Sequence, residues 1–467
     1  MTMFGSQWLA NAGASYEIDQ SIRFNDNDSA YLTRTPGSAG NQRTFTFSTW
    51  VKFCTIKADN TLFSSWIASG ASAYALIYID SSFKLRFEDQ NNTKIITTQV
   101  FRDTSAWYHV VVRVDTTDST SGDRYQMYIN GSRVTSFKTE TQPAVNYQTN
   151  VNKTQPHYLG RNGYSAAMLY SDLYQAETHF IDGTALDASS FGETNDDGVW
   201  VPKAYDGSYG TNGFYITGET AGDLGEDFSG NNNDFTSAGL TTADQMLDTP
   251  TLNYPTLNSA VIYQSGLLLS DGNLDAFGSS GSGWNLIPAT MQIPSTGKWA
   301  FECTILSSGY IMIGFASAKD INNFQGSGKY FSLMQNAGWL YNTETNKRVN
   351  GSNTNSGGLA GLTTNDVVEC MIDNDAGTMT FLKNGSAYAS LSGLNPLEQP
   401  AIAIYTNGAY RAKVDFGQID YVPSDSSYSA INSSTLPTAT VTDGSKYFQS
   451  TLYEGNGSTQ SIDQDGN

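Results

Sequence analysis

The sequence predicts an all-β protein built from two antiparallel β-sandwich (jelly-roll-like) domains in tandem. Charged residues make up only 15% of the 467 residues, fewer than the surfaces of a helical protein usually carry. Gly, Ser, Thr, Asn and Tyr are abundant, and these residues suit strand surfaces and tight turns. Short runs of alternating apolar and polar residues recur along the chain with turn residues between them, which is typical of β-sandwiches.

The first series of strand-like segments is predicted between residues 21 and 235, after a short polar N-terminal arm at residues 1–20. In "TFTFSTWVKF" Phe45 and Phe47 alternate with Ser48 and Trp50, and a large aromatic on each face indicates a strand that is covered on both sides at one end. "WYHVVVRVD" is a further strand-like segment. "RYQMYINGSRV" contains Asn130-Gly131, a hairpin signal because both residues tolerate positive φ. The stretch from 195 to 250 is rich in Gly, Asn and Asp yet keeps its aromatic residues. We therefore expect an ordered covering of loops and short strands there.

A second series is predicted between residues 272 and 423. It includes "GKWAFECTI", "GYIMIGFAS", "DVVECMID" and "TMTFLKNG", again separated by turn residues. Residues 236–271 contain "DTPTLNYPTLNS", whose prolines disfavour a helix and predict an extended linker. Residues 424–467 are expected to form a C-terminal extension or the start of a further module. Whether the natural chain continues beyond Asn467 stays open.

The composition also bears on partners. The formal net charge of −20 opposes binding to nucleic acid, which needs clustered Lys and Arg. Three cysteines lie in apolar strand-like runs, without disulfide or zinc spacing, and we expect buried free thiols. No apolar stretch is long enough to cross a bilayer, so we expect no membrane insertion.

Asp373, Asp375 and Gly377 have the D-x-D-x-G spacing that can open a calcium loop. An EF-hand loop needs a further oxygen ligand at its fifth position and a bidentate Glu at its twelfth. Here those positions hold Gly377 and Asn384, and the flanking segments read as strands. The spacing therefore predicts a β-hairpin turn in which Gly377 supplies positive φ.

Few other residues suggest catalysis. His109, His157 and His179 are isolated from Cys and from one another in sequence, so a metal site or a nucleophile–His pair would need tertiary contacts. Glycoside hydrolysis needs two carboxylates that flank the scissile bond. Acids occur in "YEID", "FEDQ" and "GETNDDG", without a repeated spacing. We expect that the protein is not an enzyme.

Two stretches resemble known families. The first, over roughly residues 21–190, resembles laminin-G-like members of the concanavalin A-like lectin superfamily. Its matching segments are "TFTFSTWVKF" (Thr44–Phe53), "WYHVVVRVD" (Trp107–Asp115), "YQMYINGSRV" (Tyr125–Val134) and "YLGR" (Tyr158–Arg161). The second, over about residues 272–420, resembles SPRY domains. Its matching segments are "GKWAFECTI" (Gly297–Ile305), "IMIGFA" (Ile311–Ala316), "GWLYN" (Gly338–Asn342), "DVVECMIDNDAGTMTFLKNG" (Asp366–Gly385) and "VDFG" (Val414–Gly417).

These resemblances have functional implications. Concanavalin A-like folds include glucanases, but the laminarinase-type signature E-x-D-x-x-E is absent here. Hydrolysis of glycans is therefore the less favoured function. Laminin-G-like domains often bind calcium, so a Ca²⁺ site stays open, and no other cofactor is expected. The two modules, joined by a "DTPTLNYPTLNS"-like linker, also resemble virion appendage proteins of tailed bacteriophages.

Aromatic residues in loops are the best candidates for ligand contacts, because Tyr and Trp provide large contact areas at low entropic cost. SPRY domains bind proteins through loops at one end of the sandwich, and that resemblance points to Trp339, Tyr341 and Asn342. Trp339 can equally be a core residue. In the first domain Trp66 and the "NGY" segment, Asn162 and Tyr164 in particular, are weaker candidates, with a core or loop role as the alternative.

The sequence therefore predicts a phage virion protein of the fibre or adhesin type. It would bind host surface glycan or protein by multivalent attachment, and dock on other virion proteins through the N-terminal arm. A homo-oligomer is expected, and trimers are common in fibres. Its location would be the phage particle surface or tail, after synthesis in the host cytoplasm. The alternative is a head fibre, decoration or tail connector protein that only packs against other virion proteins.

Overall fold

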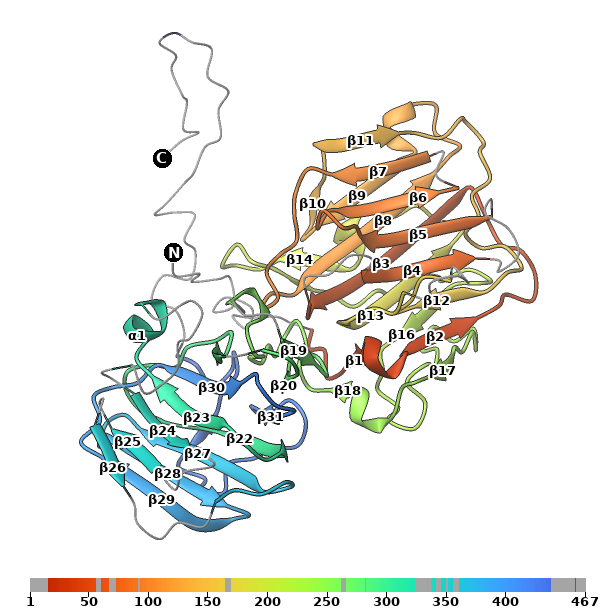
Figure 1. Cartoon of the computed structure of the whole chain (residues 1–467). Coiled ribbons are helices and arrows are strands. Elements are labelled where there is room, and N and C mark those ends of the chain that lie inside the picture. Colours follow the sequence, from red (N-terminus) through yellow and green to blue (C-terminus); the bar gives the residue numbers. More distant parts are fainter. Residues whose placement is uncertain are drawn as a thin grey trace.

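The structure, a computed structural model, describes residues 16–55, 60–66, 73–90, 93–163, 169–261, 266–281, 283–323, 334, 337–341, 346–349, 352–355, 361–437 and 458. These residues form two β-sandwiches that lie side by side (Figure 1). Within them α1 (Ala318–Asn323) is the single α-helix, and short 3-10 turns connect some strands. The predicted fold class, all-β with two sandwiches in tandem, is confirmed.

The first sandwich has two eight-stranded sheets. One contains, in sheet order, β10 (Ser132–Arg133), β9 (Tyr125–Ile129), β8 (Tyr108–Asp115), β3 (Thr44–Phe53), β13 (Leu173–Asp182), β1 (Ser21–Phe24) and β18 (Gln245–Met246), with β16 (Phe214–Ile216) paired to β13. The other contains β11 (Phe137–Thr141), β7 (Thr93–Thr97), β6 (Leu85–Asp89), β5 (Tyr74–Ile79), β4 (Asn60–Trp66), β12 (His157–Leu159), β2 (Tyr31–Arg34) and β17 (Thr236–Ala238).

Alternation along the strands explains the first core. Successive side chains of a strand point to opposite faces, so Phe45 and Phe47 of β3 both point between the sheets, where Phe47 meets Phe63 of β4. The opposite face of β3 is covered as well. There Trp50 packs under the segment that contains β14 (Gly192–Thr194) and β15 (Trp200–Pro202). The ordered covering expected for this segment is therefore present.

The second sandwich pairs an eight-stranded with a six-stranded sheet. The larger contains β19 (Leu267–Ser270), β20 (Asp275–Gly278), β31 (Arg411–Asp415), β22 (Lys298–Ser307), β27 (Val367–Asp373), β28 (Thr378–Lys383) and β29 (Ser386–Ser392), with β32 (Ser429–Ala430) beside β22. The smaller contains β21 (Trp284–Pro288), β30 (Gln399–Tyr405), β23 (Ile311–Ala316), β24 (Ala337–Tyr341), β25 (Asn346–Val349) and β26 (Ser352–Asn355).

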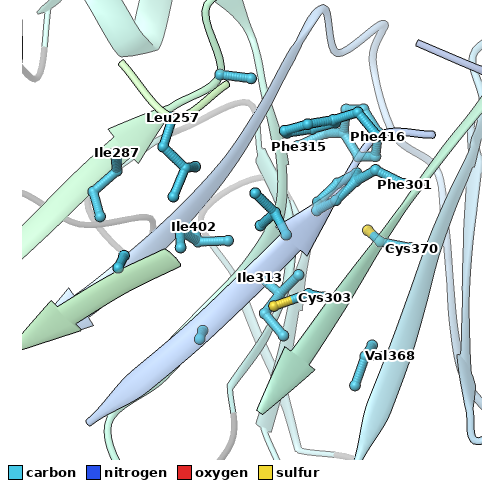
Figure 2. Packing of buried hydrophobic residues seen from close by; sticks show 14 of the residues in the cluster. Leu257, Ile287, Phe301, Cys303, Ile313, Phe315, Val368, Cys370, Ile402 and Phe416 are labelled. Atoms are coloured by element: carbon cyan, nitrogen blue, oxygen red, sulfur yellow. The ribbon is translucent and has the colours of Figure 1, made fainter. Parts of the chain in front are cut away.

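Aromatic packing and two thiols fill the second core. Figure 2 shows Phe301 beside Phe315 and Phe416, and their ring centroids lie 5.3 Å and 5.4 Å from that of Phe301. Cys303 and Cys370 lie in the same core and are fully buried. Cys54 is also a buried free thiol, so the prediction for all three cysteines is confirmed.

The two predicted hairpin turns are confirmed. Asn130 and Gly131 both have positive φ between β9 and β10. β27 and β28 pair antiparallel, from Asp373 opposite Thr378 onward, and Gly377 between them has a φ of 62°. Asn and Gly adopt this left-handed backbone at little cost, which explains their positions in both turns.

A buried segment joins the sandwiches. Residues 247–258, which we call the strap, run between them, and most of these residues are buried. The strap contacts the first sandwich where Ser21 Oγ of β1 donates to the carbonyl of Asp248 at 2.6 Å. It contacts the second where Gln418 Nε2 donates to the carbonyl of Pro255 at 2.9 Å. The segment 236–271, which the sequence predicts to be a linker, is therefore divided between the two domains. β17 and β18 belong to the first sandwich, β19 belongs to the second, and the strap between them is bonded to both.

Candidate functional site

Four aromatic side chains gather at one end of the second sandwich. Trp284 opens β21, Tyr310 directly precedes β23, Tyr405 ends β30 and Tyr410 directly precedes β31. The ring centroid of Tyr310 lies 5.8 Å from that of Tyr405 and 5.5 Å from that of Tyr410. The ring of Trp284 lies 5.4 Å from that of Tyr405. We call these four residues the aromatic end.

Glycine makes this arrangement possible. A Cβ atom on Gly309 would lie only 1.9 Å from a ring carbon of Tyr410, and a Cβ on Gly408 would lie 2.8 Å from the same ring. Only residues without a side chain let the tyrosine pack so close to both turns. The turns are also tied by their backbones, because the N–H of Tyr405 donates to the carbonyl of Tyr310 at 3.0 Å.

The aromatic end combines exposure with a fixed geometry. The side chain of Tyr310 is 37% exposed, while Trp284, Tyr405 and Tyr410 are half-buried. Their rings meet edge to face, an arrangement that aromatic pairs favour and that limits their motion. Rigid rings with polar tips suit contacts with sugars or with peptide, because little entropy is lost on binding.

The structure corrects one predicted contact residue in this domain. Trp339 is 2% exposed and packs in the interior with Met312 and Ala403, so its indole is a core group and not a surface contact. Tyr341 ends β24, where its backbone is paired with that of Met312 in β23. The side chain of Tyr341 and the whole of Asn342 lie outside the described residues.

In the first sandwich, Trp66 and the "NGY" segment lie together. A Cβ on Gly163 would lie 2.6 Å from Cβ of Trp66, so Asn162 and Gly163 run directly against the tryptophan. Trp66 is 6% exposed and stacks on Tyr74 with ring centroids 4.3 Å apart. Trp66 therefore serves packing and does not form an exposed platform. Tyr164 lies outside the part of the chain that the structure describes.

His109 and His157 are held as neutral packing groups. Trp200 Nε1 donates to Nδ1 of His109 at 3.0 Å, so the imidazole proton is on Nε2 and points to Ser48 Oγ at 2.9 Å. Burial lowers the pKa of His109 to about 3. In this tautomer Nε2 of His109 donates to the Ser48 hydroxyl, and Nδ1 already accepts from Trp200. His109 therefore cannot take the hydroxyl proton of Ser48 as a general base would. Burial likewise lowers the pKa of His157 to about 4.

The two aspartates of the D-x-D-x-G segment accept hydrogen bonds from nearby backbone N–H groups. Asp373 accepts from the backbone N–H of Ala376 at 2.9 Å, and this hydrogen bond lowers the pKa of the carboxyl. Asp375 accepts from the N–H of Gly297 at 3.1 Å. Glu88 and Asp89 are neighbours on β6 and so point to opposite faces of the sheet. Among the described residues, no group of three or more His, Cys, Asp or Glu side chains is arranged to hold a metal ion.

Three other carboxylates lie opposite one another on neighbouring strands. Glu302 of β22 is in register with Glu369 of β27 and with Asp415 of β31. Glu369 accepts from Tyr421 Oη at 2.9 Å, and Asp415 accepts from the N–H of Gly417 at 2.8 Å. Burial, and next the charge of Asp415, raise the pKa of Glu302 to about 7. Ionisation of Glu302 therefore places three negative charges side by side, which is unfavourable.

Comparison with known proteins identifies both domains. Residues 25–173 match the family model of the concanavalin A-like lectin/glucanases superfamily, in its laminin-G form, and residues 298–398 match that of the SPRY domain. The chain thus contains a laminin-G-like domain followed by a SPRY domain. No curated protein sequence matches the chain. In the described part of the chain, no helix is long and apolar enough to cross a membrane.

Several solved structures are similar to parts of the chain. The SPRY domain of human HERC1 is 15% identical, with 36% of this chain and 99% of that chain covered and a TM-score of 0.29. The PSpry domain of TRIM65 is 12% identical, with 34% and 91% covered and a TM-score of 0.28. A protein from Bacteroides ovatus named for carbohydrate binding is 13% identical, with 48% and 58% covered and a TM-score of 0.32.

A weak signal for the aromatic end is present in the sequence, and the prediction missed it. "SGSGW", "SSGY" and "TNGAY" each place an aromatic residue directly after small turn residues. Such a residue is held at a loop tip, where it can reach solvent. That these three loops converge depends on the pairing of β21, β23 and β30, which the sequence alone did not specify.

Proposed function

We propose that this chain is a structural protein of a tailed-phage virion, of the fibre or adhesin type, which attaches to a host surface glycan or protein. The observation that carries the proposal is the aromatic end, a group of partly exposed rings that pack edge to face at one end of the second sandwich. The lectin-type fold of the first domain supports a binding role as well.

The strap adds a mechanical argument. Its residues are buried between the sandwiches and bonded to both, so the aromatic end is held at a fixed orientation to the first domain. A fixed orientation favours multivalent binding, because several copies on one particle can engage together without ordering a flexible linker. The proposed form is therefore a homo-oligomer, anchored on other virion proteins through the N-terminal arm.

The proposed role requires neither catalysis nor a cofactor. Tyr and Trp side chains contact sugars or peptide directly, and the net charge of −20 disfavours nucleic acid as the ligand. Calcium is tested by repeating the binding measurement with EDTA. Incubation with host polysaccharide tests hydrolysis, and shortened polymer would contradict the non-enzymatic role.

The experiment is binding of the purified, labelled chain to host cells and to their isolated surface polysaccharide. We expect saturable binding that Tyr310→Ser weakens and Phe228→Ser leaves unchanged. Phe228 is the matched control, because it is 39% exposed and lies in the first domain. Absence of binding to cells and polysaccharide would refute attachment. A density map of the particle with both sandwiches buried among neighbours would instead favour the head fibre, decoration or connector role.

A further inference from the structure

A lysine, an asparagine and an aspartate meet in the interior between the two sandwiches. Lys52 Nζ lies 2.8 Å from Oδ1 of Asn253 and 2.7 Å from Oδ2 of Asp248. Its third hydrogen bond goes to the carbonyl of Tyr254 at 2.8 Å. Lys52 comes from β3 of the first sandwich, whereas the other residues belong to the strap. The amine of one domain is therefore held against a side-chain amide of the segment that leads to the next domain.

The site is enclosed. The exposed fractions are 0% for Lys52, 0% for Asp248 and 2% for Asn253. The ring of Tyr174 has its centroid 6.0 Å from Lys52 Nζ, and Trp107 Nε1 donates to Asp248 Oδ1 at 3.1 Å. In such surroundings a charged pair loses the hydration that favours it, so transfer of a proton from the ammonium to the carboxylate becomes less costly.

The three groups have complementary chemistry. A neutral lysine amine is a nucleophile, and burial or an adjacent base activates it. The amide carbon of Asn253 is the electrophile, one bond away from the oxygen that Lys52 already contacts. Burial raises the pKa of Asp248, which suits a carboxyl that takes up a proton and returns it. Asn253 Nδ2 donates to the carbonyl of Ser105 at 3.0 Å, and this bond keeps the amide oxygen turned to the lysine.

We propose that Lys52 and Asn253 form an intramolecular isopeptide bond, with Asp248 as the acid–base group. Asp248 takes a proton from the Lys52 ammonium, and the free amine attacks Cγ of Asn253. A new N–C bond forms and the bond from Cγ to Nδ2 breaks. Asp248 returns its proton to Nδ2, which departs as ammonia. Of the two hydrogens on the attacking amine, one stays as the N–H of the new amide, and the other passes through Asp248 to the departing ammonia, which leaves the site as ammonium. No oxidant, reductant or cofactor enters the balance.

The bond would lock the junction covalently. Lys52 and Asn253 are separated by 201 positions in sequence, so the bond closes a loop that contains the strands of the first sandwich from β4 to β18. Closing a long loop restricts the unfolded chain and favours the folded state. The strap would then be attached to β3 by a covalent bond as well as by packing, and the orientation of the two domains would survive mechanical load on an assembled particle.

Mass spectrometry of the purified full-length chain tests the bond. We expect an intact mass lower than the sequence mass by one ammonia, and a tryptic cross-linked peptide pair that joins Lys52 to Asn253. Lys52→Arg keeps the positive charge but cannot form the bond, so its mass should equal its sequence mass. Asp248→Asn should show the same result if the variant is folded by circular dichroism, because the acid–base group is missing.

Two results would overturn the proposal. One is a folded wild-type protein with the full sequence mass, which would mean that the three residues form only a buried ion pair. The other is a loss of ammonia that persists in Lys52→Arg or maps elsewhere, for example to a succinimide at Asn130-Gly131. Both measurements are made on the protein without any ligand, so they are independent of the proposed attachment function.

Discussion

Replacing Arg23 with methionine removes a buried cation that links the two sandwiches. Arg23 Nη2 lies 2.7 Å from Oδ1 of Asp271 in the second sandwich and 3.1 Å from Oδ1 of Asp244, and its side chain is 3% exposed. Removing one partner of a buried pair costs about 3–5 kcal/mol. Both carboxylates keep another partner, since Asp271 pairs with Lys413 at 2.5 Å and Asp244 accepts from Thr241. The expected loss of stability is therefore at the lower end, about 3 kcal/mol.

Urea unfolding followed by tryptophan fluorescence measures this loss. The control is Arg133→Met, which removes an ion pair with Asp123 of similar length, 2.6 Å, whose side chains are 44% and 33% exposed. An exposed pair contributes about 0–1 kcal/mol, so the control should unfold nearly as the wild type does. A loss for Arg23→Met no larger than that for Arg133→Met would refute the view that the junction is a buried, bonded interface.

Three further changes test local features. The pKa of Glu302 is raised from the ordinary glutamate range to about 7, so the folded state binds the extra proton and stability falls as the pH rises toward 7. Glu302→Gln should melt at the same temperature as the wild type at pH 5 and at a higher temperature at pH 8. Equal melting temperatures at both pH values would contradict the raised pKa of Glu302 beside Asp415. Gly385→Ala should cost about 1 kcal/mol in urea unfolding, because φ is +74° there with no atom in the way. Gly37→Ala also meets no atom and lacks the positive φ, so an equal cost for both would show that φ is not the cause. Gly309→Ala should displace Tyr410 and weaken attachment in the cell-binding assay with little change in melting, and full binding would argue against the aromatic end.

The local part of the fold could be predicted from sequence because it depends on local chemistry. Alternation in "TFTFSTWVKF" predicts that Phe45 and Phe47 share one face of β3, and the structure shows that this face points to the core between the sheets. Asn130-Gly131 and Gly377 marked turns because positive φ is cheap for these residues. The same D-x-D-x-G spacing that suggests calcium binding is a hairpin turn in the structure, as its missing ligands indicated.

The tertiary part could not be predicted in this way. Trp339 has the same sequence context as a loop aromatic. Only the structure shows that its ring is buried against Met312 and Ala403, on the face of the smaller sheet that is turned away from the main core. The prolines and polar residues of the strap predict only an extended linker. They do not indicate that Lys52, 201 positions away, forms a hydrogen bond with Asn253. The aromatic end is likewise assembled from separate loops that the sheet brings together.

Hydroxyl-radical footprinting of the chain bound to host surface polysaccharide tests the attachment role most directly. Tyr310 and Phe228 are 37% and 39% exposed, so both are oxidised in the free protein and serve as probe and control. The account predicts that binding protects Tyr310, together with Tyr405 and Tyr410, and leaves the oxidation of Phe228 unchanged. Bound protein in which the aromatic end stays as reactive as in the free chain would contradict it.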